Sequence, residues 1–113
     1  MSMEPLKSEF EERIFVSVMR QGGKKKLDTL LGLFRSEAPK RVAEIETAED
    51  PSEMKAAATV LKSSAANLGL LGLEDLCDQM IATGNASLKS QFKPALDKAQ
   101  VWLEGRRKAL TLI

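Results

Sequence analysis

Apolar residues recur every three or four positions along almost the whole chain of 113 residues. This spacing places them on one side of an α-helix, and no segment shows the period-two alternation of a half-buried strand. The pattern predicts helical segments at about 6–20, 24–45, 52–67, 71–83 and 87–110. Because the joining loops are short, neighbouring helices should run antiparallel. The chain is expected to be all-α, an antiparallel up-down four-helix bundle with an additional short N-terminal helix.

Glycine and proline mark the expected boundaries. Gly22-Gly23 should end the first helix, and Pro39 should kink the second near residues 34–37, because proline removes a backbone donor and crowds the preceding turn. Asp50 or Ser52 is available as N-cap of the third helix. The residues expected on the buried faces are Leu27, Leu31, Phe34, Ala38, Val42, Ile45, with Leu30 and Leu33 widening this stripe, and Met54, Ala58, Leu61, Ala65, Leu68, Leu73, Leu76, Cys77, Met80, Ile81, Phe92, Leu96, Ala99, Leu103 and Leu110.

The chain contains no histidine and a single cysteine, Cys77. This composition supplies neither the Cys/His clusters of structural zinc nor an internal disulfide, so no metal site is expected. It also excludes histidine-based acid–base or nucleophilic catalysis. No cofactor-binding loop is recognisable, and we expect neither a cofactor nor an enzymatic activity. Cys77 lies on the apolar stripe of its helix and is interpreted as a core residue.

Length and charge indicate one cytoplasmic domain, residues 1–113, with the bundle core at about 10–110. The first ten residues include Glu4, Lys7 and Glu9 where a signal peptide would be apolar, and no apolar run is long enough for a membrane span. The 17 Lys and Arg residues nearly balance the 16 Asp and Glu residues. A net charge of +1 gives no reason to expect nucleic-acid or membrane binding.

The strongest motif starts at Ala56 and reads AAATVLKSSAANLGLLGLEDLCDQM. It resembles the phosphate-accepting helix and the following helix of histidine-containing phosphotransfer (HPt) domains, with matches at Leu61-Lys62, Asn67-Leu68-Gly69 and Leu76-Cys77. Gly69 suits the left-handed residue that ends such a helix. The upstream segment LDTLLGLFRSEAPKRVAEIETA resembles the family's preceding helix, including its proline. The resemblance covers about residues 10–110.

Two departures from the family pattern fall at decisive positions. Thr59 stands where the family has its phosphorylated histidine, and Ser63 stands where it has a glycine. A threonine alcohol needs a base to become nucleophilic, and a phosphothreonine ester would not readily return its phosphate. The resemblance therefore implies a pseudo-HPt protein with no catalytic residue.

The rotation of 100° per residue turns Thr59 away from the seam residue Ala58 and predicts an outward face around it. In the HPt family this face docks a receiver domain. The resemblance thus implies that the chain, as a monomer, binds a response-regulator receiver domain or a hybrid histidine kinase in phosphorelay signalling without accepting phosphate. The residues predicted to bind the partner are Lys55, Thr59, Lys62, Ser63 and Ala66.

One alternative is a structural or assembly bundle whose partner uses another surface, for instance the Lys24 end. Lys24-Lys25-Lys26 begins a predicted helix, an unfavourable place for cations, so these residues are either solvated or matched by a partner's acids. Arg106-Arg107-Lys108 ends a helix, where cations suit the dipole, and is interpreted as structural.

Overall fold

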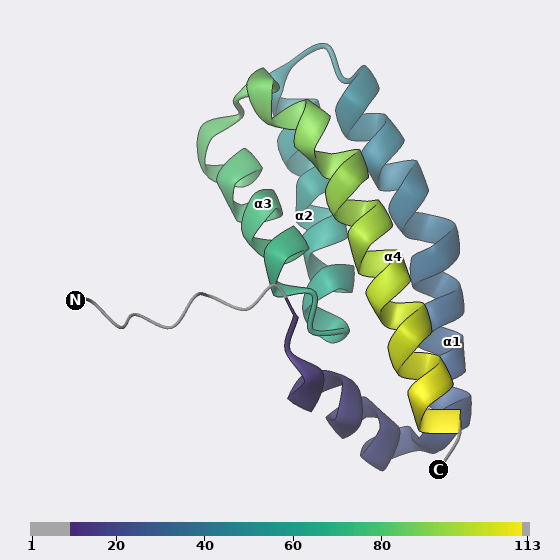
Figure 1. Cartoon of the computed structure of the whole chain (residues 1–113). Coiled ribbons are helices and arrows are strands. Elements are labelled where there is room, and N and C mark those ends of the chain that lie inside the picture. The colour runs from purple at the N-terminus through teal and green to yellow at the C-terminus, as the bar shows by residue number, and fades with distance from the viewer. Residues whose placement is uncertain (1–9, 112–113) are drawn as a thin grey trace, which may run out of the picture.

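The computed structural model describes residues 10–111, without the side chains of Phe15, Leu110 and Thr111. Within this range the chain forms helices and no strand, so the all-α prediction is confirmed. Four of the helices pack as an antiparallel up-down bundle (Figure 1). The elements are α1 (Glu12–Thr47), α2 (Pro51–Asn67), α3 (Leu71–Thr83), the short 3-10 helix η1 (Ala86–Leu88) and α4 (Lys89–Thr111).

Helix α1 consists of two arms that meet at Gly23. This glycine has φ 71° and ψ −171°, outside the helical region, in a conformation that is costly for any residue with a Cβ. The short arm before Gly23 turns away from the long arm and runs across the lower end of the bundle (Figure 1). The predicted stop at Gly22-Gly23 and the additional N-terminal helix are therefore present in the structure.

The region around Pro39 differs from the expectation. Gly23 alone within α1 has non-helical backbone angles, so residues 34–37 remain helical ahead of the proline. Pro39 itself is exposed on the outer side of α1. Ala38 and Val42 pack into the core on either side of it. Core packing of the long arm holds the helix together across the missing backbone donor, and the real break lies sixteen residues upstream.

The first helix begins later than the apolar spacing indicated. Leu6 lies outside the described residues, and Phe10 and Glu11 are not helical. The Glu11 side chain caps the helix by accepting from the Arg13 N–H at 3.0 Å, while the Glu11 N–H donates to the Gly69 carbonyl at 2.7 Å. This contact with the end of α2 draws the chain out of the helix. Phe10 then stacks on Trp102, with ring centroids 4.6 Å apart.

The core is built from the predicted apolar stripes. Most of the predicted core residues are buried, but Leu33 is 55% exposed, so its placement on the buried stripe was wrong. Leu30 and Ile81 are half-buried against the core, and the side chain of Leu110 is not among those described. Trp102 is half-buried, and no polar or charged residue of the described range is fully buried. The strict segregation of apolar and polar residues explains why helical periodicity alone predicted this bundle.

Both ends of α2 are fixed by specific caps. Asp50, one of the two predicted N-caps, accepts the Glu53 N–H at 2.9 Å. At the other end Gly69 has φ 72°; its N–H donates to the Ala66 carbonyl, and the next N–H, of Leu70, donates to Ala65. This is the Schellman arrangement, which requires a left-handed residue and so favours glycine. Helix α2 therefore presents its residues in a fixed register.

Candidate functional site

Helix α2 packs against both α1 and α3, so it has two covered sides and one outward side. Its inward residues include Ala57, Ala58 and Ala65, which are fully or almost fully buried. Small side chains at these positions let the neighbouring helices approach closely. The outward side is the face that the sequence predicted around Thr59, and it is called the α2 face below.

The hydroxyl groups of the α2 face bond to their own helix. Thr59 is exposed, and its Oγ1 donates to the Lys55 carbonyl at 2.8 Å. Ser63 is also exposed, and its Oγ donates to the Thr59 carbonyl at 3.4 Å. Both bonds are the back-bonding that threonine and serine make within helices. Neither hydroxyl therefore donates to a side-chain base.

Lys62 is held by a neighbouring helix. Its Nζ lies 2.6 Å from Oδ1 of Asp78 on α3, and both side chains are partly exposed. The hydrogen bond and charge of Asp78 raise the pKa of Lys62 above its ordinary value. Glu74, one turn earlier on α3, acts in the same direction. The cation of the α2 face is consequently fixed in place and partly balanced before any partner arrives.

Asp78 was not among the site residues predicted from the sequence. The signal was present, because Glu74 and Asp78 are four residues apart and share one face of α3. Only the rotation of α3 against α2 decides that this face meets Lys62. The other two members of the predicted set, Lys55 and Ala66, are half-buried at the edges of the α2 face. The Lys55 chain lies across Gly84, where an added Cβ would be 3.0 Å from Lys55 Cε.

A groove between α1 and α2 adjoins the α2 face and was not predicted from the sequence. It encloses about 420 Å³ and is lined by residues that include Arg41, Ala56 and Val60. Val60 is 47% exposed, unusual for a large apolar side chain in this protein. The α2 face therefore continues into an apolar edge beside Thr59.

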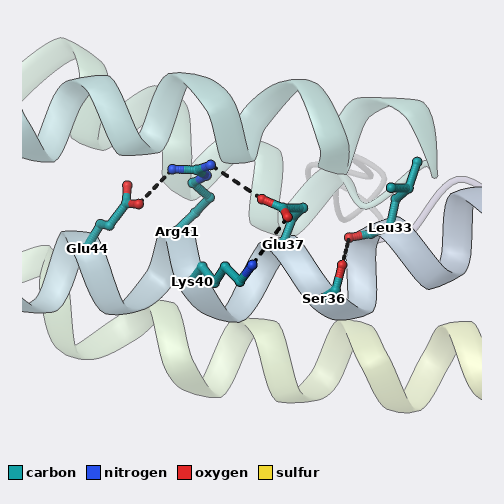
Figure 2. Close-up of polar contacts among 6 residues, drawn as sticks. All are labelled: Leu33, Ser36, Glu37, Lys40, Arg41 and Glu44. Carbon is teal, nitrogen blue, oxygen red and sulfur yellow. Dashed lines mark hydrogen bonds and ion pairs between the residues drawn. The ribbon is translucent and has the colours of Figure 1, made fainter.

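Arg41 is fixed on the α1 side of this groove by two acids of its own helix, as Figure 2 shows. Its guanidinium lies 2.6 Å from Glu44 and 3.3 Å from Glu37, and Lys40 joins the cluster at 3.6 Å from Glu37. Glu44 is the main reason that the pKa of Arg41 is raised. The Nε atom of Arg41 is buried and has no hydrogen-bond partner within the described residues.

Cys77 on α3 is fully buried, as the sequence predicted. Burial raises the pKa of its thiol to about 12, and the nearby carboxylates of Asp78 and Glu74 add to the effect. The thiolate is therefore negligible at neutral pH. Within residues 10–111, no three His, Cys, Asp or Glu residues are grouped so that they could hold a metal ion. None of the helices described is both long and apolar enough to span a membrane.

Comparison with known proteins agrees with this helical arrangement. The family model of the Hpt domain matches residues 29–102, well over half of the chain. The chain therefore belongs to the Hpt domain family, whose members act in two-component phosphorelays as carriers of phosphate.

A solved structure shows the same fold. Histidine-containing phosphotransfer protein B from Pseudomonas aeruginosa PAO1 superimposes with a TM-score of 0.81 at 15% sequence identity. The match covers 92% of this chain and 98% of that protein. No curated protein sequence matches the chain.

Proposed function

We propose that the chain binds a receiver domain through the α2 face and does not itself accept phosphate. The observation that carries this proposal is the combination of an exposed, small-residue face on α2 with a chain that lacks histidine altogether. A free response regulator or a hybrid histidine kinase would present such a receiver domain. We place the interaction in the cytoplasm and expect a monomer to make it.

The shape and chemistry of the α2 face support docking. Thr59 and Ser63 are short and exposed, so a partner backbone can come close to α2. Val60 supplies an apolar contact at one edge, and Lys62 supplies a fixed cation at the other. A receiver domain carries acidic residues around its phosphorylated aspartate, and these complement a lysine that is already oriented.

The hydrogen bonds of Thr59 argue against phosphate transfer. Its hydroxyl proton goes to the Lys55 backbone carbonyl, which cannot serve as a general base. An unactivated alcohol does not attack a phospho-aspartate at a useful rate. The charge of Lys62 is also partly balanced by Asp78, which weakens its pull on an incoming phosphoryl group.

The docking claim is tested in two steps. The purified chain is first used to recover its partner from the source cell, and a receiver-containing protein is identified among the bound proteins. Titration calorimetry then compares the wild type with Lys62→Glu and Ser63→Arg. Both variants should weaken binding by about tenfold or more, as expected for charge reversal or added bulk inside an interface. The matched controls are Lys93→Glu and Ser90→Arg, which make the same changes at exposed positions of α4. Normal binding by both α2 variants would show that the partner uses another surface.

The second part of the proposal needs a separate assay. The chain is mixed with the same receiver carrying radiolabelled phosphate, and the label on each protein is followed after gel separation. We expect no stable label on this chain. Label that accumulated on the wild type would overturn the claim that the protein does not accept phosphate.

A further inference from the structure

The fold brings two basic runs that are about eighty residues apart in sequence to the same end of the bundle. The start of the long arm of α1 carries Lys24-Lys25-Lys26, and the last turns of α4 carry Arg106-Arg107-Lys108. These two segments lie side by side at the lower end in Figure 1, joined by an ion pair of 3.3 Å between Arg107 and Asp28. Residues 11–28 and 104–108 are called the basic end.

Charge is distributed unevenly along the molecule as a result. The basic end carries eight Lys and Arg residues against four Asp and Glu residues, a net charge of +4. The whole chain has a net charge of only +1, so the remaining residues together carry −3. The nearly neutral total, which gave no reason to expect nucleic-acid or membrane binding, conceals a local cationic surface.

The carboxylates of the basic end are already ion-paired with arginines. Glu12 lies 2.6 Å from Arg106, Asp28 lies 3.3 Å from Arg107, and Glu11 and Glu104 are likewise paired with arginines. The side chains of Lys24, Lys25 and Lys26 are exposed and make no ion pair within residues 10–111, and the same holds for Arg20. Four cations are therefore left without an internal counter-charge.

The position of the three lysines at the start of a helix makes their unpaired positive charge unfavourable. They occupy the first turn after the break at Gly23, where the helix dipole is positive and cations are unfavourable. Nothing inside the described molecule offsets this arrangement. Lys24 also precedes Asp28 by one turn, so it lies on the side of α1 that meets α4.

We propose that the basic end binds a flexible acidic segment of a partner protein. Consecutive helical residues point 100° apart, so the three lysines fan around α1 and do not lie in one plane. A flat membrane surface or a stiff nucleic-acid duplex would meet only part of this fan, whereas a flexible acidic chain can follow it. The exposed large apolar side chains that the structure describes, Leu33, Val60 and Val101, lie outside the basic end, so the surface described there is recognised by its charge.

This contact is separate from the α2 face, and its test does not depend on a receiver domain. The full chain is titrated with a fluorescein-labelled peptide of eight glutamates at low and high NaCl concentration. The test variant replaces Lys24, Lys25 and Lys26 with glutamine. The matched control makes the same change in net charge at Lys40, Lys93 and Lys98, which are exposed elsewhere on the bundle.

We expect the test variant to bind the peptide about fivefold or more weakly, the control to stay within about twofold, and added salt to weaken the wild type. Replacement of the three lysines by arginine should preserve binding, which separates loss of charge from loss of fold. Equal losses in the test and control variants, or no binding by the wild type, would overturn the proposal. Tighter lysine-dependent binding to phosphatidylserine vesicles or to duplex DNA would also overturn it, in favour of that other ligand.

Discussion

Nζ of Lys62 on α2 lies 2.6 Å from Oδ1 of Asp78 on α3. The ammonium group of Lys62 on the α2 face is therefore oriented by α3, a helix that carries none of the predicted partner-binding residues. Such a lysine loses little side-chain freedom when a partner binds, because it has already been ordered. In the proposed complex it would meet the partner as half of an ion pair, which suits recognition better than charge neutralisation of a phosphoryl group.

The first prediction concerns this pair. Asp78→Asn should lower the pKa of Lys62 toward its ordinary value of 10.5, because the main cause of the upward shift is removed. Glu74→Gln is the matched control and should lower it less, since Glu74 is a smaller cause. The measurement is an NMR titration of the Lys62 Cε resonance. Because the folded-state pKa is raised, the stabilisation is complete below pH 10.5 and is lost as the pH rises through the folded-state pKa. Equal shifts in the two variants would contradict the pairing.

The second prediction compares two glycines whose replacement by alanine should change the stability in opposite directions. Gly69→Ala should destabilise the protein by about 1–3 kcal/mol, because φ is 72° and the new Cβ would collide with the Glu11 carbonyl oxygen. Gly32→Ala should stabilise it by about 0.5–1 kcal/mol, because Gly32 is an exposed helical residue with open space around it. Urea unfolding at 25 °C measures both. A stabilised Gly69→Ala variant would show that the Glu11–Gly69 contact does not form.

The third prediction concerns alkaline pH. The pKa of the Cys77 thiol is raised from 9.0 to about 12 by burial, so the unfolded chain ionises first. Stability from this group is complete below pH 9 and should fall by up to about 1.4 kcal/mol per pH unit between pH 9 and pH 12. Cys77→Ala should unfold with a shallower dependence on pH over that interval. A rapid reaction of native Cys77 with a thiol reagent at pH 8 would contradict its burial.

The fourth prediction restores the missing nucleophile. Thr59→His should accept phosphate from a phosphorylated receiver, because the neutral imidazole needs no additional base to attack. Since Thr59 is exposed, the free energy of unfolding should change by no more than about 0.5 kcal/mol. Thr59→Ala is the control and should remain unlabelled. If the histidine variant bound the receiver yet took no label, Thr59 would not occupy the position of the phosphorylated histidine.

The helices and the core were predictable because their signals are local. The stripe of Leu27, Leu31, Phe34, Ala38, Val42 and Ile45 repeats with the helical period and is buried throughout, although Leu33 beside it is exposed. The stop at Gly23 and the left-handed Gly69 were also readable from residue type. Near Pro39 the helix continues with helical backbone angles, and the non-helical residue of α1 is Gly23. The expected helix start near Leu6 lies outside the described residues, and Phe10 and Glu11 are not helical because the Glu11–Gly69 contact draws the chain away.

The sequence by itself determined the all-α fold, the outward position of Thr59 and the absence of histidine chemistry, since these follow from residue types and their spacing along one helix. Tertiary structure decided which charges meet. Lys62 with Asp78, Arg106 with Glu12 and Arg107 with Asp28 all join different helices. Helical spacing fixes the face that a side chain occupies but not the rotation of one helix against the next. The two basic runs therefore become a single surface only when α1 and α4 lie side by side.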